Sequence, residues 1–410
     1  MSEINLSEEQ LAAVALARSH RISIVTGGPG TGKTATIKAI VAAAQEAGLV
    51  QCMAPTGKAA KRMSECLDGM IATTIHRALG FDPATGGFKH GATDPLPGMT
   101  LIMDEATMAD LSLLASVLDA MRPEARIVFV GDVDQLPSVG PGTCFRDLIA
   151  SGVVPVARLT KIYRQCEGSR IATNCRAINA GEMPEFEDAA DSFFCAAEPE
   201  EIWPQIESIY LDRIASFAYR AEDVQVLTPQ RKTDNGIDSL NLRLQALLNP
   251  DVGQDAWTFP TKTFRLGERV IQKKNNYQIQ SLDGCEPGCF NGEVGKVVEF
   301  RGYGQGERMI IDMGDHRKLA ITKQEAGTFE LAYALTIHSS QGSEFPAAIV
   351  VATSQHSRMQ NRCLFYTAMS RPKQHVWVVG DERAMAKAVR TITPHERRGR
   401  LVARLRAVCA

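Results

Sequence analysis

The stretch ISIVTGGPGTGKT, at residues 22–34, joins a short β-rich run to the start of a helical pattern. Its last eight residues match G-x-x-x-x-G-K-[ST], the pattern of a phosphate-binding loop that follows a strand and opens a helix. Glycines let backbone N–H groups turn toward phosphate oxygens, and the helix amino terminus adds positive potential. We expect Lys33 to reach the β- and γ-phosphates of a nucleotide and the Thr34 hydroxyl to bind Mg²⁺. The residues predicted to surround the phosphates are Gly28, Pro29, Gly30, Thr31, Gly32, Lys33 and Thr34.

Short β-rich runs alternate with helical patterns on both sides of this loop. Such alternation favours parallel sheets covered by helices, and therefore an α/β fold. In the first half the runs lie at 22–26, 49–54, 100–103 and 126–130, and the helical patterns at 32–47, 57–67 and 108–121. In the second half similar runs lie at 224–228, 347–352 and 375–379.

Polar side chains follow two of these runs directly. The run at 100–103 ends in Asp104 and Glu105. We expect Asp104 to hold Mg²⁺ and Glu105 to orient and deprotonate an attacking water, although Glu105 could also serve as a first-turn acid of the next helix. The run at 126–130 is followed by Gln135, which is either a contact to the γ-phosphate or a solvated turn residue. The pattern therefore predicts nucleotide hydrolysis.

Gln10 lies near the amino terminus, three residues after Ser7 and before an apolar-periodic helix. That spacing is typical of a capping box, which gives Gln10 a structural role. Its amide can also read the donor–acceptor pair of an adenine. The spacing alone does not distinguish the two roles.

The composition of the 410-residue chain excludes several classes of protein. There are 45 Lys+Arg and 47 Asp+Glu, so the net charge of -2 excludes a globally basic nucleic-acid coat but not a local basic groove. No apolar run is long enough to span a bilayer, and the acidic start MSEINLSEEQ is unlike a signal peptide. The ten cysteines are scattered, which favours reduced thiols in the cytoplasm.

Three segments interrupt the alternation. Gly86, Gly87 and three prolines mark 81–97 as a projecting hairpin or loop. Residues 263–334 contain short strand patterns and the turn signal Asn-Gly, which predict a small all-β insertion. The segment 383–406 is basic, and we interpret it as a solvated helix in preference to a phosphate-contacting patch.

Eight motifs in order resemble those of superfamily 1 helicases, and most closely those of the RecD-like branch, which also contains Dda-type phage helicases. The motifs are GGPGTGKT (27–34), APTGKAAKRM (54–63), TIHRALG (74–80), MDEATM (103–108), VGDVDQLPSVGPG (130–142), LTKIYRQ (159–165), YALTIHSSQGSEF (333–345) and LFYTAMSRPK (364–373). The resemblance covers about residues 6–381. It implies two RecA-like domains, at 1–155 and 156–410, with ATP bound between them and an SH3-like barrel at about 263–334.

The resemblance also implies roles for individual residues. Gln10 would contact adenine, Arg164 and Arg371 would act as arginine fingers on the γ-phosphate, and Gly342 and Glu344 would line the same cleft. Phe88 would form the tip of a strand-separating wedge within 81–97. The residues that would line a single-strand channel are Thr56, Lys58, Thr74, His76, Thr336 and His338.

One motif departs from the family pattern, because Ser339 and Ser340 stand where a basic residue is common. A phosphate contact in the second domain could therefore be weaker.

The function that the resemblance implies is an ATP-dependent DNA helicase that moves 5′→3′ along single strands. Its partners would be single-stranded DNA and junctions of single and double strands. A single-strand-binding, replication or recombination protein is a candidate further partner. The chain would act as a monomer in the cytoplasm of a bacterium, encoded by the bacterium or a phage. The alternatives are an RNA helicase, a translocase that displaces proteins, and a strand clamp switched by nucleotide.

Overall fold

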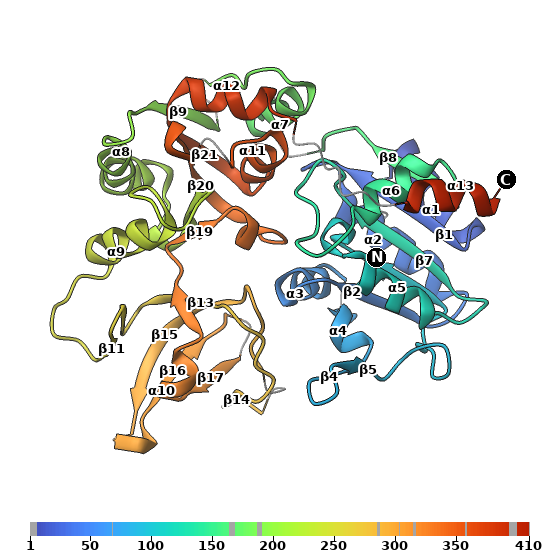
Figure 1. Cartoon of the computed structure of the whole chain (residues 1–410), viewed down its shortest axis with the longest axis horizontal. Coiled ribbons are helices and arrows are strands. Elements are labelled where there is room, and N and C mark those ends of the chain that lie inside the picture. Colours follow the sequence, from blue (N-terminus) through green and yellow to red (C-terminus); the bar gives the residue numbers. More distant parts are fainter. Residues whose placement is uncertain are drawn as a thin grey trace. The chain divides into compact units, whose positions relative to one another are not determined.

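The computed structural model describes residues 6–67, 69–163, 169–186, 191–284, 288–302, 304–314, 317–356, 359–392 and 400–409. The chain forms two compact units, each built around a parallel sheet (Figure 1). Unit 1 comprises residues 1–180 and 392–410, and unit 2 comprises residues 181–391.

The sheet of unit 1 has six strands in the order β3-β2-β6-β7-β1-β8. All neighbouring pairs are parallel, so the carboxyl ends of the strands lie along one edge. The four runs predicted in this half are all strands of the sheet. The strands are β1 (Ile22–Gly27), β2 (Val50–Ala54), β3 (Thr73–Thr74), β6 (Thr100–Met103), β7 (Arg126–Gly131) and β8 (Val156–Leu159).

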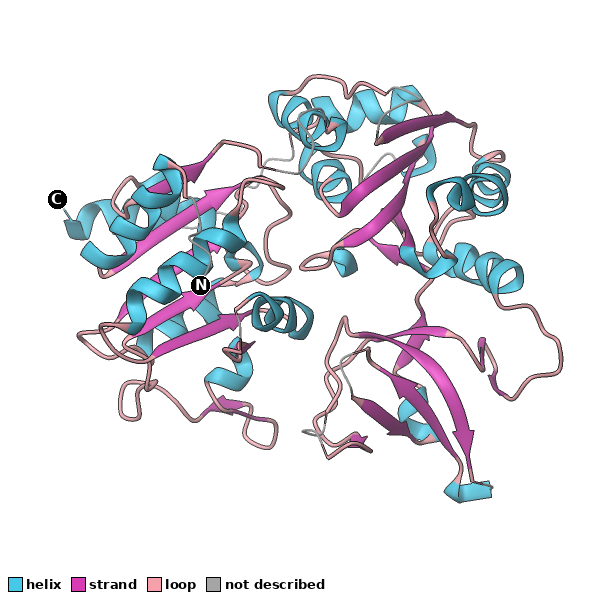
Figure 2. Ribbon diagram, turned by 180° about the vertical axis from the view of Figure 1, so that it is seen from behind, coloured by secondary structure: helices cyan, strands magenta, loops and turns pink. Residues whose placement is uncertain are grey.

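Helices cover both faces of this sheet (Figure 2). Adjacent strand residues point to opposite faces, so Ile24 packs in one apolar cluster and Val25 in the other. Helices α1 (Glu8–Ser19), α2 (Lys33–Gln45) and α3 (Gly57–Cys66) share the cluster of Val25; α4 (Ile75–Ala78), α5 (Leu111–Asp119) and α6 (Cys144–Ser151) share that of Ile24.

The described end of the chain returns to unit 1 as helix α13 (Leu401–Cys409). Leu401 and Leu405 pack against the apolar cluster that contains α6. The Arg406 guanidinium donates to the carbonyl oxygens of Ala150 and Ser151, 2.8 and 3.1 Å away, which caps the end of α6. The basic segment is therefore partly a docked helix.

The predicted division at 155/156 differs from the structure in two places. β8 pairs with β1 and so completes the first sheet, and residues 392–410 also belong to unit 1. The segment 383–406 is accordingly divided, with helix α12 (Glu382–Arg390) in unit 2 and α13 in unit 1. The amino acids of a strand do not determine which of two sheets the strand joins. The sequence pattern alone could therefore not place the boundary between the two units.

The parallel sheet of unit 2 has the strand order β19-β10-β20-β21-β9. The three runs predicted in this half are its central strands, and Trp377 in β21 is fully buried. The edge strands β9 and β19 were not predicted. The bounds are β9 (Ser192–Ala196), β10 (Val224–Thr228), β19 (Ala334–Thr336), β20 (Phe345–Ala352) and β21 (Pro372–Gly380).

A mainly β insertion, which also contains the short helix α10 (Lys323–Ala326), lies between helix α9 (Ile237–Leu248) and β19, close to the predicted limits of 263–334. It begins earlier than predicted, with the hairpin of β11 (Ala256–Phe259) and β12 (Lys262–Arg265). Its main sheet is antiparallel, in the order β14-β17-β16-β15-β13-β18. These strands are β13 (Arg269–Gln272), β14 (Gln280–Ser281), β15 (Val294–Arg301), β16 (Arg308–Asp312), β17 (Lys318–Ile321) and β18 (Phe329–Leu331).

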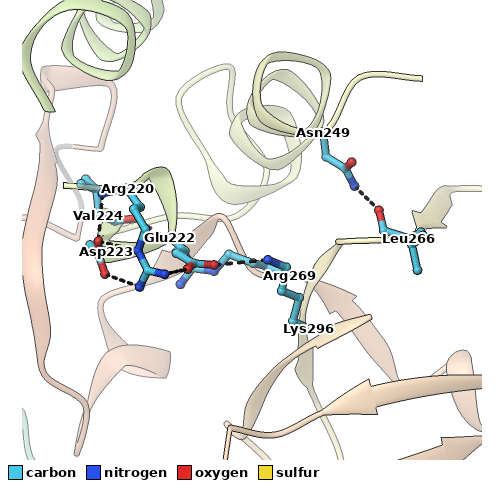
Figure 3. Close-up of polar contacts among 8 residues, drawn as sticks. All are labelled: Arg220, Glu222, Asp223, Val224, Asn249, Leu266, Arg269 and Lys296. Carbon is cyan, nitrogen blue, oxygen red and sulfur yellow. Dashed lines mark hydrogen bonds and ion pairs between the residues drawn. The ribbon is translucent and has the colours of Figure 1, made fainter. Parts of the chain in front are cut away.

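Polar contacts and a shared core hold this insertion against the parallel sheet of unit 2 (Figure 3). The Arg269 guanidinium donates to the Val224 carbonyl oxygen, and Lys296 forms an ion pair of 3.3 Å with Glu222. One apolar cluster contains both Ile349 of the parallel sheet and residues of β13, β16 and β18. The insertion and the sheet are therefore one packed body.

The remaining elements are short. They include the hairpin of β4 (Phe81–Asp82) and β5 (Gly87–Phe88), and the helices α7 (Arg170–Ala180), α8 (Ile202–Ser208), α10 (Lys323–Ala326) and α11 (Arg362–Met369). In the described part of the chain, no helix has the length and apolar character needed to cross a bilayer.

Candidate functional site

The phosphate-binding loop lies between β1 and α2, as predicted. Gly30 and Gly32 have φ angles of +74° and +80°, a region that residues with a Cβ rarely occupy. The Lys33 ammonium donates to the carbonyl oxygens of Gly27 and Gly28 at 2.7 and 2.9 Å. These bonds hold the lysine side chain over the loop, and Lys33 and Thr34 are the first two residues of α2.

Gln10 performs the capping role that its spacing allowed. Its backbone N–H and side-chain oxygen form the reciprocal bonds of a capping box with Ser7. The same amide also donates through Nε2 to the Gly32 carbonyl oxygen at 3.3 Å, and its side chain is buried. α1 is therefore attached directly to the phosphate-binding loop, while the predicted contact to adenine stays a prediction.

Tyr163 is a candidate site residue that sequence reasoning missed. Its backbone N–H donates to the Gly30 carbonyl oxygen at 2.8 Å, and its ring lies beside Gly32 with 39% of the residue exposed. The preceding segment is held to α1, because Glu9 accepts hydrogen bonds from the backbone N–H groups of Thr160 and Lys161. The sequence feature that could have indicated Tyr163 is its position as an aromatic residue directly before Arg164. Arg164 itself lies outside the described residues.

The acidic pair lies at the carboxyl end of β6, two strands from the phosphate-binding loop in the order β6-β7-β1. Burial, reinforced by the neighbouring Glu105 charge, raises the pKa of Asp104 to about 6, although the charges of Arg62 and Lys33 act in the opposite direction. A half-buried carboxylate with this surplus of negative charge is suited to bind a cation.

Glu105 has an unusual backbone conformation. Its φ of +50° lies in the left-handed region, and only 8% of the residue is exposed. Its N–H donates to Asp104 Oδ1 at 2.8 Å. Left-handed conformations at residues other than glycine cost roughly 1–3 kcal/mol and concentrate at functional sites. The backbone conformation of Glu105 is therefore consistent with a functional role.

Gln135 lies beyond the carboxyl end of β7, the strand between β6 and β1. Its side chain is buried, and Nε2 donates to Asp132 Oδ2 at 3.2 Å. The structure therefore brings Gln135 to the same sheet edge as the loop and the acidic pair, and not to a solvated turn.

Two of the three threonines predicted to line a strand channel, Thr56 and Thr74, are helix-capping residues. Thr56 and Thr74 accept backbone N–H groups at the starts of α3 and α4, and Thr336 accepts the N–H of Ser339. Capping uses the acceptor capacity of a hydroxyl but leaves it one O–H donor. Thr56 lies just beyond β2 and Thr74 ends the adjacent strand β3, so their hydroxyls lie at the edge that carries the phosphate-binding loop. Lys58 lies in the first turn of α3, beside Thr56.

His76 forms an aromatic cluster with the hairpin that follows it. Its ring centroid lies 5.6 Å from that of Phe81 and 5.8 Å from that of Phe88. Burial lowers the pKa of His76, an effect partly opposed by the charge of Asp110. Phe88 pairs with Phe81 at the base of the hairpin, and the turn is made by 83–86. The expectation that Phe88 forms the tip is therefore wrong, because its ring packs inward on the cluster.

The predicted residues of unit 2 gather around the turn after β19. Burial lowers the pKa of half-buried His338, and Gly342 has a φ of +70°. The Arg371 guanidinium is 3% exposed and donates to the carbonyl oxygens of Ser343 and Thr367. Glu344 forms an ion pair of 3.1 Å with Lys373.

Comparisons with known families agree with this architecture. A model of the AAA domain matches residues 5–194, a model of the ATP-dependent RecD-like DNA helicase SH3 domain matches 240–313, and a model of the UvrD-like helicase C-terminal domain matches 331–379. Together with the loop, the acidic pair and the two parallel sheets, these matches define a superfamily 1 helicase.

The similarity to curated relatives is more specific. The ATP-dependent RecD2 DNA helicase of Deinococcus radiodurans is 36% identical over 380 residues, which are 92% of this chain and 50% of that protein. The RecBCD enzyme subunit RecD of Mycolicibacterium smegmatis is 32% identical over 433 residues, which are 93% of this chain and 72% of that protein. The chain belongs to the RecD family of helicases, and it spans half the length of the Deinococcus relative.

Solved structures with a similar fold include Pif1 helicases. The Candida albicans enzyme is 19% identical with a TM-score of 0.58, and the alignment covers 99% of both chains. Bacteroides Pif1 bound to single-stranded DNA is 19% identical with a TM-score of 0.59, covering 96% of this chain and 95% of that one. At this identity the similarity shows the fold alone.

Proposed function

We propose that this chain is an ATP-dependent DNA helicase that moves along single-stranded DNA. The observation that carries the proposal is the single sheet edge in unit 1 on which the phosphate-binding loop, Asp104 and Glu105 lie beside the Thr56 and Thr74 hydroxyls. Because the hydrolytic site and the hydroxyl donors toward the DNA strand would share one sheet edge, nucleotide hydrolysis could change how tightly the DNA strand is bound.

The nucleotide would be ATP with Mg²⁺. Thr34 and Asp104 would hold the cation, and the surplus of negative charge at Asp104 fits that role. The cation would neutralise charge on the phosphates. Glu105 would then accept the proton of the attacking water, while Lys33 and Gln135 would contact the phosphates.

Tyr163 and Gln10 would form the adenine side of the site. The exposed Tyr163 ring offers a stacking surface next to the loop, and Gln10 bears an amide within the same local network. Arg164 and Arg371 would supply positive charge to the γ-phosphate, and Gly342 and Glu344 would lie near it.

The strand would be gripped through its phosphates. The hydroxyls of Thr56 and Thr74, with Lys58, His76 and His338, would contact the backbone without reading sequence. The hairpin within 81–97 would act at the junction of single and double strands, with Phe88 supporting its base. Movement would be 5′→3′. The protein would work as a monomer in a bacterial cytoplasm, with a single-strand-binding or recombination protein as partner.

The test is ATP turnover measured without nucleic acid and then with matched single-stranded DNA and RNA. We expect DNA to stimulate turnover strongly and RNA not to do so. Stimulation by RNA alone would identify an RNA motor, and strand binding without stimulation would identify a clamp. Forked duplexes with a single 5′ or 3′ tail then measure unwinding and its polarity, and a preference for the 3′ tail would refute the proposed direction.

A further inference from the structure

A lysine of the mainly β insertion contacts the turn that follows β19. Lys273 lies directly after β13, and its ammonium donates to Ser339 Oγ at 3.3 Å. Both residues are half-buried. The two positions are 66 residues apart in sequence, so the insertion delivers an ammonium group to a turn that contains no lysine or arginine between Thr336 and Ser340.

The Ser339 hydroxyl accepts two hydrogen bonds within this region, which leaves its O–H as a donor. Its Oγ accepts from the Thr336 hydroxyl at 2.9 Å and from Lys273. A serine hydroxyl has two acceptor lone pairs and one donor hydrogen, so these two bonds use its acceptor capacity. The Ser339 O–H is therefore available to an acceptor outside the turn, and the ammonium keeps two further N–H donors.

Within the described residues no carboxylate lies within ion-pair distance of the Lys273 ammonium. Its backbone is fixed, because its N–H donates to the Thr328 carbonyl oxygen and β13 is anchored through Arg269 to Val224. Two fixed donors beside an uncompensated charge make a site for an anion.

We propose that Lys273 and Ser339 together bind one backbone phosphate of the single strand. The proposal rests on the proposed function, because the strand supplies the phosphate. A nucleotide phosphate has the same chemistry, so the experiment must separate the two sources.

The experiment compares the affinity for fluorescent single-stranded DNA of the wild-type chain and of Lys273→Met, which keeps the aliphatic stem but not the charge. We expect about tenfold weaker binding at about 0.1 M salt, as for the loss of a charged hydrogen bond. The slope of log affinity against log salt should fall by about 0.7, as for one phosphate contact on a single strand. Lys387→Ala, at an exposed position on α12, is the control and should change neither quantity.

A rescue variant distinguishes the contact from a structural role. Ser339→Lys in the Lys273→Met background should restore both the affinity and the salt slope, because it returns a cation to the turn. Wild-type affinity in Lys273→Met would overturn this proposal alone, and no strand binding by the wild-type chain would overturn the proposed function as well. Weaker binding of a fluorescent ATP analogue by Lys273→Met, with unchanged strand affinity, would assign the pair to the nucleotide and overturn the proposal.

Discussion

The backbone N–H of Tyr163 donates to the carbonyl oxygen of Gly30 at 2.8 Å, which ties the segment before Arg164 to the phosphate-binding loop. Because Gln10 donates to Gly32 in the same loop, three separate parts of the sequence meet there. Any change in the loop on nucleotide binding therefore reaches both α1 and the segment that leads out of the first sheet.

Tyr163→Ala should weaken ATP binding about tenfold without unfolding unit 1, because base–aromatic stacking contributes roughly 1–3 kcal/mol. Titration with a fluorescent ATP analogue measures the change. Tyr163→Phe keeps the ring and the backbone bond, and should bind as the wild type does. Wild-type affinity in Tyr163→Ala would show that the ring does not contact the base.

Glu105→Gln should still bind ATP but should hydrolyse it at least about 10²-fold more slowly, because the amide cannot accept the proton of the attacking water. Single-turnover hydrolysis at saturating ATP separates this chemical step from binding. The exposed acid Glu124 provides the matched control, and Glu124→Gln should hydrolyse at the wild-type rate. Rapid single-turnover hydrolysis by Glu105→Gln would contradict the assignment of the base.

Leu405→Ala should lower the free energy of unfolding of unit 1 by about 1–2 kcal/mol, since it removes apolar contact between α13 and the core. Urea unfolding followed by circular dichroism gives the value. Val408 lies on the same helix and is 86% exposed, so Val408→Ala should have no measurable effect. Equal stability of the two variants would mean that α13 is not docked in solution.

Acid should destabilise unit 2 through His356. Burial lowers the pKa of His356 from 6.5 to about 4, and its ring shares a hydrogen bond of 2.8 Å with Thr233. Between about pH 6.5 and pH 4 the unfolded chain binds a proton that the folded chain does not, so stability falls as the pH falls. The loss of folding free energy approaches about 3 kcal/mol, because a pKa difference of one between the folded and unfolded chain corresponds to about 1.36 kcal/mol.

His356→Gln should therefore lose less stability than the wild type over that pH range, measured by urea unfolding at each pH. His20 is exposed, and His20→Gln should leave the pH dependence unchanged. Parallel stability curves for wild type and His356→Gln would show that the acid sensitivity originates elsewhere.

Local patterns predicted the parts of the site that depend on adjacent residues. The loop at 27–34 and the pair Asp104–Glu105 follow strands, and parallel pairing brings such strand ends to one edge. The insertion was also predicted closely, because its short strands and Asn-Gly turn contrast with the surrounding α/β pattern.

Features that depend on distant contacts were not predictable. The capping roles of Thr56 and Thr74 require the exact helix starts, and the inward packing of Phe88 requires its contact with His76. The position of Tyr163 depends on a hydrogen bond to a loop more than a hundred residues away. The contact of Lys273 with Ser339 likewise exists only because the insertion packs against the second sheet.

The packing of α13 on unit 1 has a consequence for co-translational folding. Arg406 follows its partner Ser151 by 255 residues, so the nascent chain must complete unit 2 before α6 receives its covering helix. Domains are expected to fold as they emerge, amino-terminal part first. Unit 1 is therefore expected to begin folding first. The apolar surface beside α6 stays exposed until α13 has been synthesised, so unit 1 is completed after unit 2.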